Sequence, residues 1–389
     1  MSRIKVRRPG RRFAIVAGGL AVLMLAAVFA VGWYYSSVLR SGGLEPDYSP
    51  DEPDLRVVSV GGGRVVLIER EGEDVDTLDD VGLWGLEGES GYGQAAAILQ
   101  IDGEEVTREF KLLSGTIEAG DFVRLDSFAF DGDPLTARGL AFRSVAVPSP
   151  LGAMPAWKLD GASSTWVIFV HGWRADREEA LRILPAVASL ELQSLVITYR
   201  NDEEAPRSQD GLIRWGATEW QDLEAAVDYA VSEGAQSVVL YGFSMGGGTA
   251  MRFLQQSNRA DVVAAAVLDA PVLDFDALLD FQAEQRNIPG VVVDLGRQFA
   301  QWRFDLDYEA MDHMQHLERV DVPILLFHGD DDDRAPIETS ERLAKERSDI
   351  VTFVVAKGAG HVRAWNLDPD AYEQTVKQFL AGVAGVPAP

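Results

Sequence analysis

The chain has 389 residues, and its 35 lysines and arginines stand against 61 aspartates and glutamates, so its formal net charge is −26. This acidity argues against nucleic-acid binding, because affinity for a phosphate backbone comes mostly from clustered cations. A hydrophobic share of 47% is that of a globular protein, and the lack of any cysteine excludes disulfides, thiolate zinc sites and cysteine nucleophiles.

The N-terminus has the opposite charge to the rest of the chain. Six cations lie within residues 1–12, and an uncharged run of 23 residues follows from Phe13 to Tyr35. A helix of that length spans about 34 Å, enough for a hydrocarbon core of about 30 Å. Trp33, Tyr34 and Tyr35 end the run as an aromatic belt of the kind found at membrane interfaces. The sequence therefore predicts a transmembrane helix at 13–35.

The positive-inside rule predicts that residues 1–12 form a cytoplasmic basic segment. The expected protein is then a single-pass protein of the cell membrane, with its body on the extracytoplasmic side and the lipid bilayer as a partner of residues 13–35. A cleaved signal peptide, with Val28 and Ala30 before the cleavage site, is the alternative, although its apolar region would be only about 7–15 residues long.

Residues 36–54 are rich in Ser, Gly, Pro and Asp and are interpreted as a linker. Residues 55–140 show strand patterns separated by turn signals and no long helical pattern, which predicts a small β-rich module of unknown role. Its predicted strands are Arg56–Ile68 with a turn at Gly61–Gly63, Ala95–Ile101, Glu109–Leu113 and Phe122–Phe130.

From about residue 141 short apolar strands alternate with helical patterns, which is typical of a mostly parallel sheet covered by helices on both faces. A helix is expected from about Asp176, with Glu179 completing a capping pair, and another at Ala217–Ser232. Asp368 and Pro369 are suited to begin a closing helix that runs to Val383. The predicted strands are Thr165–Val170, Ser194–Tyr199, Ser237–Tyr241, Val262–Leu268, Pro323–Phe327 and Ile350–Val355.

The strand at 237–241 leads directly into Gly242-Phe243-Ser244-Met245-Gly246, and a helical pattern follows. Gly-x-Ser-x-Gly between a strand and a helix is a nucleophile elbow, a sharp turn that presents the serine hydroxyl at the carboxyl edge of the sheet. Gly242 and Gly246 are expected there because larger side chains would collide with neighbouring backbone. Ser244 is therefore the candidate nucleophile.

A serine nucleophile needs a base, and the base needs an orienting acid. His361 lies in a glycine-rich loop after the strand at 350–355, and four consecutive aspartates, Asp330–Asp333, follow the strand at 323–327. The order serine, acid, histidine is that of a known class of hydrolases. The residues alone leave all four aspartates open as the acid.

With these motifs, residues 141–389 resemble the α/β-hydrolase superfamily, in particular its serine aminopeptidase-like members. The resemblance implies the α/β-hydrolase fold with a cap insertion at about 275–312. It also implies that Asp332 is the acid, because His328 to Pro336 follow the family pattern His-Gly-x-x-Asp-x-x-Val-Pro with alanine in place of valine. Trp173, after His171-Gly172, and Met245 would supply the oxyanion-hole amides.

The remaining candidates receive simpler interpretations. His171 and His328, each at a strand end, are expected to be structural hydrogen-bonding residues. A calcium site on the aspartate run lacks EF-hand spacing, and His313 and His316, which would face one way on a helix, lack a third zinc ligand, so no metal site is expected.

The sequence thus predicts a membrane-anchored serine hydrolase that cleaves a carboxylic ester or thioester through an acyl-enzyme, with catalytic residues Ser244, Asp332 and His361. Its partners would be a small-molecule acyl substrate and the bilayer, with no nucleic acid, and the chemistry needs no cofactor. A peptidase or amidase of the serine aminopeptidase type is the first alternative. A catalytically idle, membrane-tethered binding module is the second. The sequence makes no prediction of oligomeric state.

Overall fold

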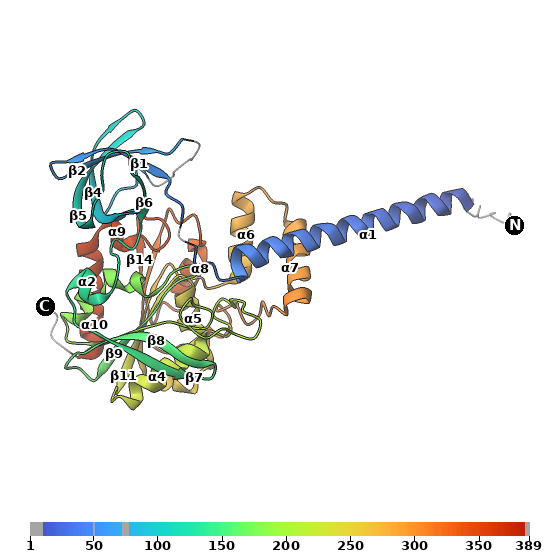
Figure 1. Ribbon diagram of the computed structural model, residues 1–389. Coiled ribbons are helices and arrows are strands. Elements are labelled where there is room, and N and C mark those ends of the chain that lie inside the picture. Colours follow the sequence, from blue (N-terminus) through green and yellow to red (C-terminus); the bar gives the residue numbers. More distant parts are fainter. Residues whose placement is uncertain (1–10, 50, 72–77, 386–389) are drawn as a thin grey trace.

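The computed structural model describes residues 11–49, 51–71 and 78–385. Figure 1 shows three parts: a long N-terminal helix that projects from the body, a small β-barrel and a large sheet flanked by helices. Most of the predicted basic segment, residues 1–10, lies outside the described residues.

The projecting helix, α1, runs from Arg11 to Leu39 and ends in a π-helical turn, η1 (Arg40–Leu44). In its first half the large apolar side chains between Ile15 and Leu25 are each more than 60% exposed. No part of the described chain covers this half of the helix (Figure 1). A helix that is apolar on all sides is compatible with a membrane anchor or a signal sequence.

The end of α1 is packed into the body. Leu44 has no exposed surface and belongs to the main hydrophobic core. Its carbonyl accepts a 2.7 Å hydrogen bond from the amide of Ile213, and the Gly43 carbonyl accepts a 2.9 Å bond from Nε1 of Trp215. The first residues of the predicted linker are therefore a fixed attachment and not a free spacer.

The β-rich region forms a closed antiparallel barrel with strand order β1-β2-β5-β4-β3-β6. Its small core contains Leu55, Val65, Leu67, Leu86 and Val123, which are wholly buried. The strands are β1 (Leu55–Gly61), β2 (Arg64–Glu69), β3 (Trp84–Gly88), β4 (Gly91–Asp102), β5 (Glu105–Gly115) and β6 (Phe122–Asp126), and the short helix α2 (Pro134–Arg138) follows.

The second sheet has eight strands in the order β14-β13-β12-β11-β9-β10-β8-β7. Strands β9 to β14 pair in parallel, whereas β7 and β8 form an antiparallel hairpin at one edge. The strands are β7 (Arg143–Ser149), β8 (Gly152–Leu159), β9 (Thr165–Val170), β10 (Gln193–Ile197), β11 (Ser237–Phe243), β12 (Val263–Asp269), β13 (Ile324–Gly329) and β14 (Val351–Ala356).

Helices cover both faces of this sheet and bury two separate apolar layers. On one face lie α4 (Trp220–Ser232), α5 (Met245–Gln256) and α8 (Ile337–Glu346); on the other lie α3 (Leu184–Ala188) and α10 (Pro369–Ala384). The short elements are η2 (Arg177–Arg182), η3 (Asn258–Val262), η4 (Leu317–Arg319) and α9 (Ala364–Leu367). This architecture confirms the predicted α/β class.

Between β12 and β13 two helices stand apart from the sheet as a cap: α6 (Phe275–Gln285) and α7 (Gly290–Phe304). Figure 1 shows them side by side, both crossing the direction of α1, with α7 farther from the sheet than α6. The cap therefore lies where the long helix leaves the body.

The helix predicted from Asp176 is only partly confirmed. Asp176 does cap a turn by accepting from the amide of Glu178, but that turn is the 3₁₀ element η2, and the α-helix α3 starts only at Leu184. Glu179 does not complete a capping pair. Its buried carboxylate instead accepts a 2.8 Å hydrogen bond from the amide of Gly172.

Candidate active site

Ser244 lies between the last residue of β11 and the first turn of α5, with backbone angles φ 48° and ψ −117°. This left-handed conformation is strained for a residue with a side chain, and such strain is typical of functional turns. The glycines on either side are required by space: a Cβ at Gly242 would collide with the backbone of Gly246, and a Cβ at Gly246 with the carbonyl of Val170. The turn leaves Ser244 8% exposed.

The structure brings Ser244, His361 and Asp332 into one row. Ser244 Oγ lies 2.8 Å from His361 Nε2, and His361 Nδ1 lies 2.8 Å from Asp332 Oδ2. Because an ionised carboxylate only accepts hydrogen bonds, Nδ1 carries a proton and donates a hydrogen bond to Asp332. In the neutral ring Nε2 is then an acceptor for the Ser244 hydroxyl proton.

Asp332 is held by four N–H groups. Oδ1 accepts from the amides of Arg334 at 2.9 Å and Ala335 at 2.8 Å, and Oδ2 faces His361 Nδ1 and, at 3.1 Å, His328 Nε2. Burial alone raises the pKa of the Asp332 carboxyl, but the charges of the two histidines and their hydrogen bonds outweigh burial and hold its pKa well below the usual range. The carboxyl is therefore ionised at neutral pH.

His328 is fully buried behind the carboxylate. Its Nε2 faces two acceptors, Asp332 Oδ2 and the Ala335 carbonyl at 3.2 Å, so Nε2 carries the proton, and Nδ1 accepts from the hydroxyl of Ser340 at 2.8 Å. His328 is thus a structural hydrogen-bonding residue, and the partner that it holds is Asp332.

The loop after β9 runs beside the serine. A Cβ added to Gly172 would lie 3.1 Å from the Ser244 Cβ, so Gly172 approaches the serine side chain closely. Within the described part of the chain, neither the amide of Trp173 nor that of Met245 has a hydrogen-bond acceptor. Met245 is also the first residue of α5, where the helix dipole favours negative charge.

Part of the chain is similar to known proteins. The model of the prolyl oligopeptidase family matches residues 208–386. Among curated relatives, the AB hydrolase superfamily protein YisY of Bacillus subtilis is 24% identical over 236 residues, covering 50% of this chain and 84% of that protein. The non-heme chloroperoxidase CPO-A1 of Kitasatospora aureofaciens is 24% identical over 257 residues, covering 55% of this chain and 91% of that protein.

Solved structures show the same fold. The Pyrococcus furiosus esterase Pf2001 superposes with a TM-score of 0.54 at 19% identity, covering 66% of this chain and 96% of its own. The chain has the α/β-hydrolase fold. A puromycin-hydrolyzing peptidase of Mycobacterium tuberculosis superposes on this chain with a TM-score of 0.51 at 17% identity, covering 85% of this chain and 54% of the peptidase.

Two buried charged residues of this α/β hydrolase, Glu179 and Arg182, bind the loops on either side of the site. Glu179 holds the Gly172 amide, and burial raises the pKa of its carboxyl against the opposing effect of the Arg182 charge. Arg182 donates from Nη1 to the Val362 carbonyl at 2.9 Å and to Asn366 Oδ1 at 3.1 Å. The pair thus links the loop next to Ser244 with the loop that carries His361. Sequence reasoning missed Arg182 and gave Glu179 a capping role, because an isolated Arg or Glu carries no motif.

The loop of His361 also rests on the barrel. Arg363 forms a 2.8 Å ion pair with Asp80 and lies over the ring of Trp84, while Asn366 Nδ2 donates at 2.8 Å to the carbonyls of Leu83 and Ser127. The barrel of the α/β hydrolase is therefore joined to the segment that follows the candidate base.

His171, next to the glycine that faces Ser244, is buried and has acceptors at both ring nitrogens. Nδ1 lies 2.9 Å from the Gly172 carbonyl and Nε2 lies 3.0 Å from Asp202 Oδ2, while the Tyr199 ring stacks on the imidazole. Burial lowers the pKa of His171, but the Asp202 carboxylate and these hydrogen bonds raise it more, to about 9. The structure thus pairs His171 with Asp202 as an ion pair and does not aim it at Ser244.

His313 and His316 do not share a helical face. His316 adopts left-handed angles, φ 56° and ψ 34°, which end any helix, and it lies at the surface beside Glu318. His313 is fully buried with Nε2 2.8 Å from the Trp215 carbonyl, and burial lowers its pKa to about 4. Among the described residues no cluster of metal-ligating side chains occurs.

An aromatic row leads from the site to the cap. The rings of Trp173, Trp215 and Phe275 follow one another at centroid distances of 5.8 and 4.9 Å, and Tyr308 continues the row at 6.2 Å. Trp215 and Phe275 are buried. The four rings belong to the main hydrophobic core or pack against it, between the loop after β9 and the base of α6.

Proposed function

We propose that this protein is a membrane-anchored serine hydrolase that cleaves a carboxylic ester or thioester. The observation that carries the proposal is the hydrogen-bonded row Ser244–His361–Asp332 with the serine in a strained turn at the end of a parallel strand. A nucleophile, a base and a buried ionised acid in this order are the parts of covalent acyl transfer.

In the proposed reaction Ser244 Oγ attacks the substrate carbonyl carbon while its proton passes to His361 Nε2. The imidazolium keeps its Nδ1 proton in the bond to Asp332, whose low pKa leaves it ionised as the counter-charge. His361 then delivers its Nε2 proton to the leaving alcohol or thiol, and an acyl-enzyme remains. A water molecule attacks the acyl-enzyme, gives a proton to His361 and releases the acid, after which Ser244 regains its proton.

The amides of Trp173 and Met245 are proposed to bind the oxyanion. Their lack of acceptors among the described residues and the position of Met245 at the start of α5 support this role. Each such donor is worth about 3–4 kcal/mol of transition-state stabilisation in well-studied hydrolases.

The membrane topology is part of the proposal. Six cations before an uncharged run of 23 residues favour a cytoplasmic N-terminus, and the exposed apolar surface of α1 needs a lipid environment. The body, with Ser244, would then lie on the extracytoplasmic side.

A second candidate is hydrolysis of a peptide or amide. It is favoured by the match of residues 208–386 to the prolyl oligopeptidase family and by the likeness to the puromycin-hydrolyzing peptidase, which extends over 85% of this chain. The same nucleophile and base would serve, with the proton delivered to a leaving amine.

Labelling of the full chain in detergent with a fluorophosphonate tests the nucleophile. Wild type and Ser232→Ala, a change in an exposed serine on α4, should label equally, and Ser244→Ala should not label. Equal labelling of Ser244→Ala would refute the assignment of the serine. If the wild type fails to label, the hydrolase proposal fails and the idle binding module becomes the better explanation.

A panel of aryl esters, aryl thioesters and aminoacyl aryl amides, assayed with the same three proteins, separates the two candidate reactions. The proposal expects ester or thioester turnover that depends on Ser244 and exceeds amide turnover at equal substrate concentration. Faster cleavage of the aminoacyl amides would instead favour the peptidase.

A further inference from the structure

The helix α7 of the cap packs against α1 through small residues. Gly32 and Ser36 on α1 are buried, and they meet Gly296 and Ala300, which are buried on α7. A Cβ at Gly32 would collide with the ring of Phe299, and a Cβ at Gly296 would lie 3.1 Å from the Tyr35 Cβ. Small residues four apart on both helices permit this close crossing, as in helix pairs within membranes.

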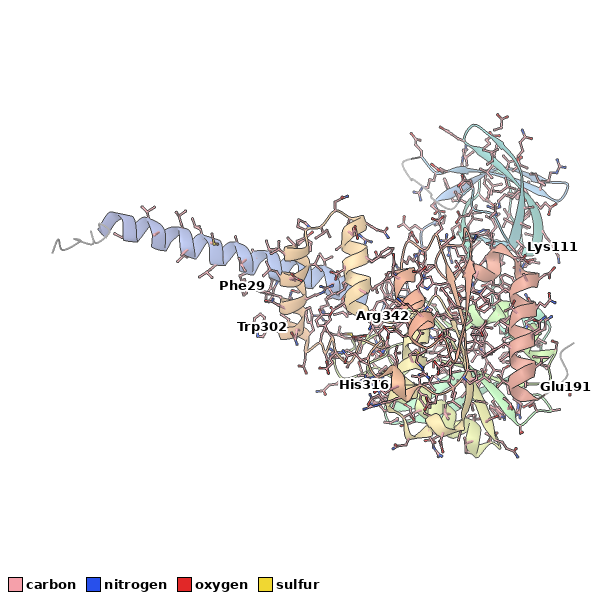
Figure 2. The ribbon with its side chains drawn as sticks, turned by 180° about the vertical axis from the view of Figure 1, so that it is seen from behind. Phe29, Lys111, Glu191, Trp302, His316 and Arg342 are labelled. Atoms are coloured by element: carbon pink, nitrogen blue, oxygen red, sulfur yellow. The ribbon has the colours of Figure 1, made fainter. Side chains whose placement is uncertain are left out.

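Aromatic side chains from both helices surround the crossing. Phe29 and Phe299 meet edge to face at 5.3 Å, and Trp302 contacts Phe299 at 5.9 Å. The guanidinium of Arg303 lies 3.7 Å from the ring centre of Trp33 and donates to Ser36 Oγ and Ser37 Oγ at 2.6 and 2.8 Å. In Figure 2 Phe29 and Trp302 lie together at the end of the cap that is remote from the sheet.

The crossing falls at the depth of a membrane interface. A hydrocarbon core of about 30 Å takes about 20 helical residues, which extends from Phe13 to Gly32. The crossing on α1 runs from Phe29 to Ser37, the level of the aromatic belt at 33–35. Because α7 lies across the direction of α1 (Figure 1), it would lie along the plane of a membrane that α1 spans.

The outer side of α7 exposes two large apolar side chains. Val291 and Trp302 are each 67% exposed, as much as the first half of α1, and they share a helical face with the half-buried Leu295 and the exposed, uncharged Gln298. The cationic Arg297 on this helix is neutralised by ion pairs with Asp276, Asp280 and Asp294. The guanidinium of Arg303, in the last turn, is turned to Trp33, Ser36 and Ser37 of α1. Contact of the Val291–Trp302 face with lipid would therefore depend on apolar side chains.

From this geometry we infer that α7 is an interfacial helix whose Val291–Trp302 face inserts into the bilayer that holds α1, and that the hydrolase acts on acyl esters resident in that bilayer. The second half of the inference rests on the proposed function. An amphipathic helix at this depth places its apolar face about 5–10 Å into the boundary between headgroups and acyl chains.

The cap connects this surface with the candidate site. Tyr308, which follows α7, donates to the Arg297 carbonyl at 3.5 Å and stacks on Phe275 at the start of α6. From Phe275 the aromatic row continues through Trp215 to Trp173, beside the serine. A row of packed rings thus connects α7 with the loop beside Ser244.

The insertion is tested without any activity measurement. The chain has no cysteine, so the full-length variants Trp302→Cys and Leu135→Cys each take a single polarity-sensitive fluorophore. Leu135 is 57% exposed on α2, away from α1. In phosphatidylcholine vesicles that hold α1, the label at 302 should be quenched by spin-labelled lipid and protected from iodide, at 50 mM and 500 mM salt alike. Quenching at 302 no stronger than at 135, or its loss at high salt, overturns the insertion.

The substrate class is tested with the double variant Val291→Asp/Trp302→Asp, with Leu135→Asp as the matched control. Hydrolysis of a long-chain diacylglycerol analogue in the same vesicles should fall about tenfold in the double variant only, because the charges oppose insertion. Hydrolysis of a soluble short-chain aryl ester should stay within about twofold for all three proteins, since no changed residue touches the site. An equal fall with both esters, or none with either, overturns the lipid-substrate inference. If the wild type cleaves no ester at all, the proposed function fails, and the fluorescence result still decides whether α7 is inserted.

Discussion

The replacement Asp332→Asn tests the assignment of the acid most directly. Oδ1 of Asp332 accepts from two amides, and Oδ2 accepts from the rings of His361 and His328. An asparagine offers one oxygen and one NH₂ group, so it matches only one of these pairs of donors. Leaving both amides without an acceptor costs about 1–3 kcal/mol, so the oxygen is expected to stay with the amides and the NH₂ group to face His361.

In that orientation Nδ1 of His361 must accept, and the ring proton moves to Nε2. Nε2 then meets Ser244 as a donor and cannot take the hydroxyl proton. The expected loss in kcat is about 10⁴-fold, or about 5.4 kcal/mol of activation free energy. The folded structure should remain, because the asparagine side chain is almost the same size as that of aspartate.

The assay is ester hydrolysis by the full chain in detergent, beside the controls Asp331→Asn and Asp333→Asn, which alter exposed neighbours in the same aspartate run. Both controls should keep wild-type activity within about twofold. If Asp332→Asn keeps more than a tenth of the activity, or if a control loses as much as Asp332→Asn, the tautomer argument is wrong.

Three further predictions concern the supports of the site. Gly246→Ala should abolish fluorophosphonate labelling, because the added Cβ collides with the Val170 carbonyl. Its control Gly382→Ala, where a Cβ meets open space, should label normally and gain about 0.5–1 kcal/mol of helix stability. Normal labelling of Gly246→Ala would contradict the need for glycine at that position. Glu179→Ala should lower the free energy of unfolding by about 3 kcal/mol, because it removes the partner of the Gly172 amide and of the buried Arg182 charge. Glu179→Gln keeps an acceptor for the amide and should lower the free energy of unfolding by less. Equal losses in the two variants would argue against the Gly172 hydrogen bond. His171 has a pKa of about 9 in the folded chain, above its unfolded value of 6.5, so its ion pair stabilises the fold fully below pH 6.5. This contribution, about 3 kcal/mol, is lost as pH rises through 9. Thermal unfolding of His171→Gln should lack this decline in stability, and a pH profile identical to that of the wild type would refute the ion pair.

The parts that the sequence predicted well are those where a local pattern has one solution. TWVIFV at 165–170 forms β9 with the same bounds, and every residue of it is buried, because only a central parallel strand hides both faces. Asp368 caps α10 through the Ala371 amide, with Pro369 at the first helical position. The strand, the two glycines and the helix around Ser244 likewise left a single tight turn.

The parts that were missed depend on contacts distant in sequence. Glu179 has the spacing of a cap, but its carboxylate is drawn to the Gly172 amide, and Pro185 lies within the first turn of the helix that actually forms. The strand β3 carries two glycines in five residues and is formed only because β4 and β6 pair with it. The acid came from a family pattern, since four adjacent aspartates look alike until the fold buries one of them.

The burial of Leu44 also decides where this chain tolerates a cut. A protein shortened to begin at residue 45, by a protease or by design, would lose the side chain that fills the core and strip the acceptors from the Ile213 amide and the Trp215 indole. Trp215 lies against Trp173, so the damage would reach the loop beside Ser244. Proteolytic release by a cut after Leu44 would thus be expected to inactivate the body as it frees it, and a stable excised body must begin no later than Gly43.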